Sequence, residues 1–462
     1  MSLAPLKKAD MPKPLSLAKL LGPSFILLGL GLGSGELILW PFLSSKYGLG
    51  IIWAAVLGIT FQFFLNMEIE RYTLATGESV FVGLTRKLLV LAPLWFIFST
   101  LIPWMWPGIA AASARLIAAL LGIEYTPFIA ILLLLLMGVI LTLGPVLYKT
   151  QEKLQRAVIL LGVPFIFALA IYFSAPSDWV AVGEGLIGKG EGFWFLPAGI
   201  SIATFLGAFA YSGAGGNLNL AQSLYVKEKG YGMGKFSGHI TSIITGKKEK
   251  ISLEGTTFKL TAANLNRFNL WWKRVNIEHG VVFWATGAIT MILLSLLAYV
   301  TVFGKGIEVE GIEFIIKEAE AIGMQTSGLL ATIFLITAAI MLFFTQFSVF
   351  GSTSRIMSEN LCLISKSIPV NKLPYYFYGF LWLQILAGIF VLSSGFTQPL
   401  QLVIISAVLN AFTMFVYSGL VLWLNLTSLP KQIRPSRIRV TMVGAAFVFY
   451  GVFSAITIAN YF

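Results

Sequence analysis

A single carboxylate follows a run of alternating glycines inside the first apolar stretch of this chain. The run reads LGLGSGE and includes Gly33, Ser34 and the carboxylate Glu36. Glycine is among the poorest helix formers, so a helix is expected to open here. A charged side chain near the centre of a bilayer is costly unless it faces a cavity or a partner. Glu36 is therefore the first candidate functional residue, as a cation ligand or as a proton carrier.

Two interpretations of the glycines remain open at this stage. An opened helix at membrane depth is tolerated where its freed backbone groups line a cavity, which is typical of a substrate site in a secondary transporter. Alternatively, the glycines only let a neighbouring helix pack closely, as small residues commonly do in membranes.

A second apolar stretch repeats the pattern of clustered glycines followed by polar side chains. Residues 205–219 read FLGAFAYSGAGGNLN, in which Asn217 and Asn219 follow a cluster that begins at Gly213. Oxygen ligands suit hard cations such as magnesium, calcium or manganese, whereas softer metals favour sulfur and nitrogen. We predict a cation site made by Glu36, Asn217, Asn219 and carbonyls near Gly33 and Gly213. The alternative for Asn217 is a cap on the following half-helix.

Other polar residues in apolar stretches are candidates to support this site or to gate access to it. These residues are Ser34, Gln346, Asn410, Glu68, Glu70 and Arg115. Interhelical hydrogen bonds are the commoner use of Gln346 and Asn410. Glu68, Glu70 and Arg71 can instead anchor a helix end as an ion network. Arg115 can extend its charged end to the outer interface or replace an acid in a proton path.

The composition is that of a polytopic membrane protein. Hydrophobic residues make up 57% of the 462 residues, charged residues 11%, and the mean hydropathy is +0.85. The net charge of +12 comes mainly from loops between apolar stretches, so no nucleic-acid partner is expected. A single cysteine, Cys362, excludes an intrachain disulfide, and two histidines are too few for a histidine-based site.

Eleven stretches are long enough to cross the bilayer, which requires about 20 residues each. They span approximately residues 18–43, 50–73, 88–121, 126–148, 155–175, 194–226, 278–303, 327–355, 374–396, 399–427 and 438–460. Basic connections alternate with acidic or sparsely charged ones. The positive-inside rule then predicts a multi-pass protein of the cell membrane with a cytoplasmic N-terminus and an external C-terminus.

The two glycine-interrupted stretches lie five spans apart and begin on opposite sides of the membrane. That arrangement predicts an all-α membrane protein built as a five-plus-five inverted repeat with broken first and sixth helices. The first repeat covers residues 1–175, and the second covers residues 176–427 with a cytoplasmic loop at residues 227–277. Residues 428–462 form an eleventh, additional helix.

The order of several motifs resembles the Nramp family of divalent-metal transporters. The motifs are Gly22-Pro23-Ser24-Phe25, Gly33-Ser34-Gly35-Glu36, Ala75-Thr76-Gly77 and Gly213-Ala214-Gly215-Gly216-Asn217-Leu218-Asn219-Leu220. The resemblance implies the leucine-transporter fold, a metal bound between the first and sixth helices, and proton coupling. The family's Asp-Pro-Gly-Asn motif falls on Gly33–Glu36, and its Met-Pro-His motif falls on Asn217–Asn219. The aspartate, sulfur and histidine ligands are therefore replaced.

Together these features predict a secondary transporter that moves a divalent cation by alternating access. Magnesium, manganese or calcium is expected in preference to soft metals. The alternative is a sodium- or proton-coupled symporter of a small organic solute such as an amino acid, since half-helix N-termini can bind carboxylates. No nucleophile–base pair or phosphate loop is present in the sequence, so neither enzymatic activity nor a cofactor is expected.

Overall fold

The computed structural model describes residues 3–17, 20, 22–143, 147–236, 253–306, 310–365 and 367–461. Within these ranges, nine helices are long and apolar enough to cross a membrane. A shorter apolar helix, α7 (Pro127–Leu143), and the interrupted sixth span complete the set of eleven. The prediction of an all-α membrane protein is confirmed.

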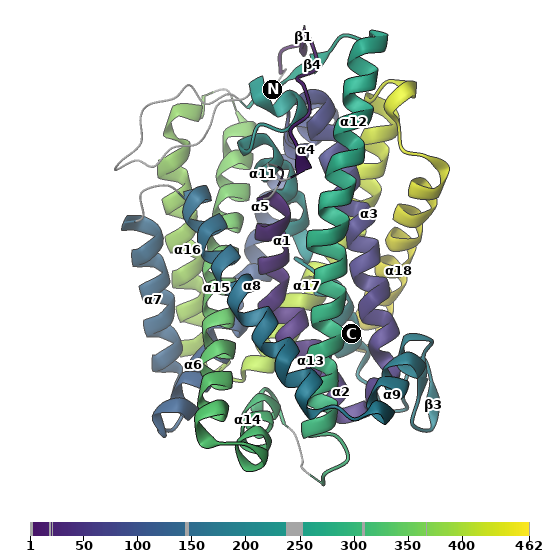
Figure 1. The fold of residues 1–462 in the computed structure, drawn as a ribbon. Coiled ribbons are helices and arrows are strands. Elements are labelled where there is room, and N and C mark those ends of the chain that lie inside the picture. The colour runs from purple at the N-terminus through teal and green to yellow at the C-terminus, as the bar shows by residue number, and fades with distance from the viewer. Residues whose placement is uncertain are drawn as a thin grey trace.

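The spans run roughly along the long axis of the molecule (Figure 1). In chain order they are formed by α1 (Pro23–Gly31), η2 (Leu32–Leu39) and α2 (Trp40–Tyr47); α3 (Ile52–Thr76); α5 (Leu91–Trp104) and α6 (Gly108–Leu121); α7; α8 (Leu147–Phe173); α10 (Ile202–Ala210), η4 (Gly216–Ala221) and α11 (Gln222–Glu228); α12 (Ala262–His279), η6 (Gly280–Ala285) and α13 (Thr286–Thr301); α15 (Gly328–Ile364); α16 (Leu373–Ser393); α17 (Pro399–Ser428); and α18 (Arg437–Tyr461).

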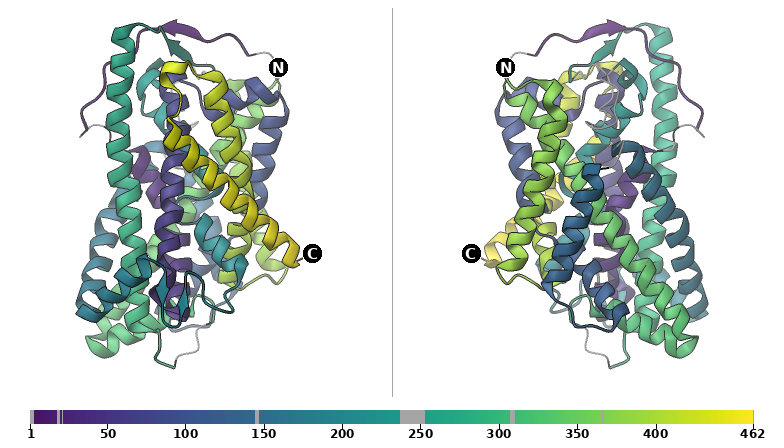
Figure 2. Two further views of the ribbon diagram at one scale, coloured as in Figure 1. Left: turned by 90° about the vertical axis from the view of Figure 1, so that its right-hand side faces the viewer. Right: turned by 90° about the vertical axis from the view of Figure 1, so that its left-hand side faces the viewer.

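Short elements cover the two ends of the bundle. The strand β1 (Lys7–Ala9) pairs in parallel with β4 (Thr256–Phe258), and β2 (Lys189–Gly190) pairs antiparallel with β3 (Phe193–Trp194). The short helices are α4 (Val80–Leu88), α9 (Pro176–Leu186) and α14 (Glu313–Gln325). Figures 1 and 2 place β1 and β4 at the N-terminal end, and α9, β3 and α14 at the opposite end.

The first span forms the centre of the bundle, and every residue from Ile26 to Ser45 is buried. The expected opening at its glycines is replaced by a wider, continuous turn, because Leu32–Leu39 is a π-helix between α1 and α2. The sixth span is interrupted between Ala210 and Gly216, and the third span has a shorter break between α5 and α6 at residues 105–107. A π-helical segment widens the backbone without freeing a stretch of it, and such segments are frequent at functional sites.

The glycines of the first span also permit close packing, which was the alternative interpretation. A β-carbon at position 35 would lie 1.6 Å from the carbonyl oxygen of Tyr211. One at position 31 would lie 2.8 Å from the backbone of Gly213, and one at position 33 would lie 2.6 Å from the side chain of Thr345. The first span therefore meets the break of the sixth span backbone to backbone.

The predicted loop at residues 227–277 is partly helical. Thr261 caps α12, and one continuous helix then runs from Ala262 to Thr301, so the seventh span extends well beyond the predicted membrane boundary at residue 278. The N-terminal segment lies along this extension. The indole nitrogen of Trp271 donates to the carbonyl of Pro12, and Arg274 donates to the carbonyl of Leu15. Residues 237–252 of the predicted loop lie outside the described residues.

The close approach of the first and sixth spans predicts that Gly35→Ala strongly lowers the stability of the protein. The added methyl group would overlap the carbonyl of Tyr211, so two backbones must separate at a cost of ~3 kcal/mol or more. We expect a clear fall in the apparent melting temperature of the detergent-solubilised protein. Gly379→Ala in α16 is the matched control, because a β-carbon there has no atom within 4 Å. Equal melting temperatures for the two variants would contradict this packing.

Candidate functional site

Glu36 is completely buried, and neither oxygen of its carboxylate has a hydrogen-bond partner among the residues that the structure describes. The carboxylate lies beside the seventh span, since a β-carbon at Gly287 of α13 would be 3.4 Å from Oε1 of Glu36. The same position is bordered by the apolar side chains of Ile59 and Leu28. A buried charge in such surroundings is stable only with a cation or a proton. This geometry suits either role predicted for Glu36.

The two asparagines after the sixth-span break each have an occupied amide nitrogen and a free amide oxygen. Nδ2 of Asn217 donates to Oγ of Ser99 and to Oγ1 of Thr100, both at 2.8 Å. Nδ2 of Asn219 donates to the hydroxyl of Tyr417, also at 2.8 Å. Both side chains are fully buried, and neither Oδ1 atom has a partner. The amide groups are thus held in place by their nitrogens, while their oxygens can accept a ligand.

Asn410 of α17 provides a third such oxygen beside the break. Its Nδ2 donates to the hydroxyl of Tyr211 at 2.8 Å, and that hydroxyl also contacts Oγ of Ser406 at 2.7 Å. Its Oδ1 has no partner and lies against Gly216, where a β-carbon would be 1.8 Å away. Gly216 directly precedes Asn217, so the amide group of Asn410 in α17 lies against the residue before Asn217. Neutral oxygens of this kind are ligands for hard cations.

In the structure the predicted ligands form two separate groups. Glu36 lies beside α13, and Asn217 and Asn219 bond to α5 and α17. Gly213 packs against Gly31 and Gln62, and Gly33 packs against Thr345, so the backbone of both spans is brought together as expected. No hydrogen bond joins Glu36 to Asn217, because the carboxylate lies beside α13 while the amide nitrogen bonds to α5. Among the described residues, no group of three or more histidine, cysteine, aspartate or glutamate side chains could hold a metal ion.

Two further candidates lie within the protein interior. Ser34 is fully buried in η2, and its hydroxyl has no hydrogen-bond partner. Gln346 of α15 is 2% exposed and follows Thr345, the residue that contacts Gly33. Oγ1 of Thr345 donates to the carbonyl of Gly29 at 3.2 Å, which links α15 directly to the first span.

The acidic cluster at the end of the second span divides into two environments. Glu68 forms a 2.7 Å ion pair with Arg71 and a 3.4 Å pair with Arg439, and Nδ2 of Asn425 donates to it at 3.1 Å. These contacts join α3 to α17 and α18, which fits the structural alternative for this pair. Glu70 lies apart and accepts a hydrogen bond from Nε2 of Gln222 at 3.2 Å.

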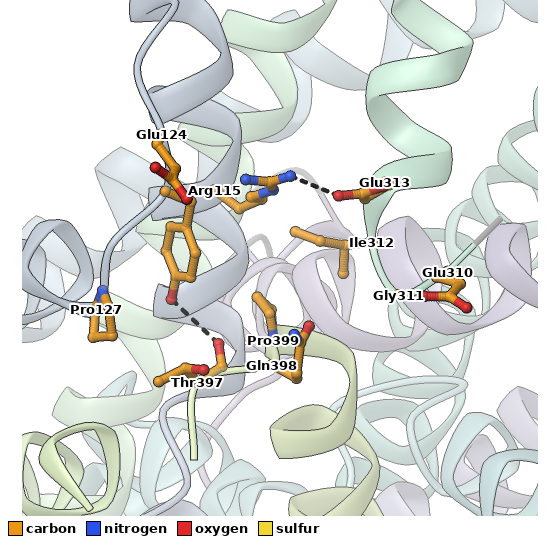
Figure 3. Close-up of a pocket in the computed structure, with 11 residues that line it drawn as sticks. Arg115, Glu124, Pro127, Glu310, Gly311, Ile312, Glu313, Thr397, Gln398 and Pro399 are labelled. Carbon is orange, nitrogen blue, oxygen red and sulfur yellow. Dashed lines mark hydrogen bonds and ion pairs between the residues drawn. The ribbon is translucent and has the colours of Figure 1, made fainter. Parts of the chain in front are cut away.

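Arg115 lies at the end of the bundle opposite the N-terminus. It forms a 2.6 Å ion pair with Glu313 of α14 and borders a cavity of about 320 Å³ that is also lined by Glu124, Tyr125 and Gln398 (Figure 3). Burial raises the pKa of Tyr125 to about 12, although the positive charge of Arg115 acts in the opposite direction. The long side chain of Arg115 thus reaches a carboxylate of α14 at this end of the bundle.

Sequence reasoning missed a residue that stabilises the break. Nε2 of Gln62 in α3 donates to the carbonyl of Ala210 at 2.9 Å, and its Oε1 accepts from the amide of Gly215 at 3.3 Å. One side chain therefore satisfies backbone groups on both sides of the interruption, which membrane burial requires. The signal was a lone glutamine within the apolar second span.

Neither models of known protein families nor individual characterised proteins match the sequence. Comparison with solved structures does find matches along the whole chain. Two single-residue variants of the Eremococcus coleocola manganese transporter have TM-scores of 0.70 at 14% identity and cover 100% of this chain and 91% of the transporter. The same transporter with an aromatic bis-isothiourea substituted compound has a TM-score of 0.65 at 13% identity, with the same coverage. The fold expected from the Nramp resemblance is confirmed.

The buried carboxylate leads to a prediction about cation binding. We expect Glu36→Gln to weaken manganese binding at least tenfold, a change of about 1.4 kcal/mol, because it removes the only negative charge of the predicted ligand set. Isothermal titration calorimetry of the detergent-solubilised protein measures this change. Glu70→Gln is the matched control, since it neutralises another buried carboxylate that lies beside Gln222 and outside this set. Unchanged affinity in the Glu36 variant would remove that residue from the site.

Proposed function

We propose that this protein is a secondary transporter that moves a divalent metal cation across the cell membrane by alternating access. The observation that carries the proposal is the buried, unpartnered carboxylate of Glu36 in a π-helical first span that packs on the interrupted sixth span. The fold shared with a manganese transporter along the whole chain supports it. Nothing in this arrangement suggests an enzyme.

The donor atoms favour manganese, magnesium or calcium over softer metals. Glu36 supplies the negative charge, and Oδ1 atoms of Asn217 and Asn219 supply neutral oxygens, together with carbonyls near Gly33 and Gly213. The Oδ1 atom of Asn410 extends this set from α17. Neither sulfur nor imidazole belongs to it, and both are the ligands that softer metals favour.

Transport requires the two parts of the ligand set to approach one another. The carboxylate of Glu36 now lies beside α13, whereas the amides of the sixth span are held by α5 and α17. We propose that residues 1–175 and 176–427 move as two repeats, so that the first and sixth spans close around the ion. Broken-helix transporters commonly work by such rocking of one repeat against the other.

We also propose that the N-terminus is cytoplasmic and the C-terminus external, in contact with the lipid bilayer. Arg86 pairs with Glu78, which accepts a hydrogen bond from the amide of Gly255 beside β4 at the N-terminal end of the bundle. Glu184 of α9 and Glu191 of the β2–β3 turn belong to elements at the opposite end. This distribution agrees with the positive-inside rule.

Metal uptake into proteoliposomes tests the proposed function. We expect the native protein to accumulate manganese in a saturable manner, with magnesium and calcium as competing substrates, and Glu36→Gln to reduce the initial rate at least tenfold. An internal pH-sensitive dye reports accompanying proton movement. Correct insertion is checked by protease protection of each sample.

Absence of metal uptake by correctly inserted native protein would overturn the metal assignment. Uptake of an amino acid under a sodium or proton gradient in the same vesicles would then establish the organic-solute symporter instead.

A further inference from the structure

A second polar cluster joins the beginning of the first span to the seventh span. Oγ of Ser24 donates to Oε2 of Glu278 at 2.6 Å and lies 2.8 Å from Nδ1 of His279. Ser24 and His279 are fully buried, and Glu278 is 6% exposed. The imidazole lies between the rings of Phe63 and Phe283, with centroids 5.8 and 4.7 Å away. Sequence reasoning had set the two histidines aside.

We assign the protons of this cluster with Glu278 ionised. A serine hydroxyl has one proton, and Ser24 donates it to Glu278. Nδ1 of His279 must then be the donor to Oγ of Ser24. Two atoms remain without a partner, Nε2 of His279 and Oε1 of Glu278. With a neutral imidazole and an ionised carboxylate, the three side chains carry a net charge of −1 in the protein interior, where burying a charge is costly.

We propose that Ser24, His279 and Glu278 form the proton-binding relay of this transporter. An incoming proton binds Nε2 of His279. The proton on Nδ1 then passes to Oγ of Ser24 as the hydroxyl proton of Ser24 passes to Oε2 of Glu278. The incoming proton forms the N–H bond at Nε2. In the transfer that follows, the Nδ1–H and Oγ–H bonds break as new Oγ–H and Oε2–H bonds form, and both His279 and Glu278 end neutral. The net charge of the cluster changes from −1 to 0.

Charged groups face this cluster from the elements packed against it. Glu70 of α3 and Lys229 after α11 act on Glu278 with opposite signs, and the guanidinium of Arg156 in α8 lies 5.7 Å from the ring of Phe25, next to Ser24. Lys227 of α11 is 5% exposed. Other charged groups on the packed elements have contacts of their own, namely Glu68, Arg71, Glu228, Arg267, Arg274, Arg355, Glu359 and Arg439.

The position of the relay links proton uptake to the helix that carries Glu36. Ser24 lies in the first turn of α1, which continues directly into the π-helical segment. His279 is the last residue of α12, and the second π-helical segment, η6, follows at once. Proton binding reverses the direction of both hydrogen bonds that join α1 to the seventh span, beside which the carboxylate of Glu36 also lies. A proton bound here is therefore placed to alter the packing of both spans.

The inference rests on the proposed transport function and is tested with manganese as the probe. Proteoliposomes receive external manganese and contain a pH-sensitive dye. We expect His279→Gln, Glu278→Gln and Ser24→Ala to reduce the number of protons moved per manganese ion at least fivefold, while manganese still enters down its gradient. Ser24→Thr keeps the hydroxyl and should restore the native ratio.

Two matched controls separate the relay from buried polar groups in general. Glu318→Gln removes a carboxylate of α14 that is 2% exposed and has an unpartnered Oε1. Ser113→Ala removes a buried hydroxyl that bonds to the carbonyl of Ala339 at 2.9 Å. Both controls should keep the native ratio of protons to manganese. A native ratio in the three relay variants would overturn the relay alone, whereas absence of manganese uptake by the native protein would overturn the transport function.

Infrared difference spectroscopy tests proton binding without transport. Acidification of the detergent-solubilised native protein should produce a carboxylic-acid C=O band that is missing in Glu278→Gln and present in Glu318→Gln. Retention of the full band in folded Glu278→Gln would overturn the relay even where that variant transports poorly.

Discussion

The rest of this structure depends on the direct contact between the backbones of the first and sixth spans. Glycines at positions 31 and 35 bring the first span against Gly213 and the carbonyl of Tyr211, with no room for a side chain between them. The sixth span interrupts its helix at this point, so its freed backbone groups need partners within the protein. Gln62 supplies them on both sides of the interruption. The contact, the break and the glutamine therefore depend on one another.

The same constraint explains why the polar side chains diverge. With the backbones in contact, Glu36 emerges toward α13, and the amides beyond the break turn toward α5 and α17. Each amide is held through its nitrogen, which leaves the oxygen available. Hydrogen bonds from the amide nitrogens hold these side chains, and therefore their oxygens, in fixed positions. A ligand site whose atoms are fixed in this way is preorganised before the ligand binds.

Much of the fold was predictable because its signals are local. Long apolar stretches mark the spans, and the sixth-span glycines marked a true interruption. The first-span glycines gave the same local signal but a different outcome, because close packing against Tyr211 and Thr345 keeps that helix continuous. The cluster of Ser24, His279 and Glu278 was not predictable. Ser24 lies more than 250 residues before the other two and meets them only through the packing of the helices. The candidate site residues were predicted from the glycine clusters, but the directions of their side chains depend on that same packing.

The seventh span is unusually long, and its length has a mechanical consequence. Forty residues from Ala262 to Thr301 make a helix of ~60 Å, at 1.5 Å per residue. A tilt of a few degrees near its π-helical middle would displace its projecting end by several ångströms. The N-terminal segment is fastened to that end through Trp271 and Arg274 and would be carried with it. A small rearrangement at the middle of the seventh span is thereby converted into a displacement of the N-terminal segment.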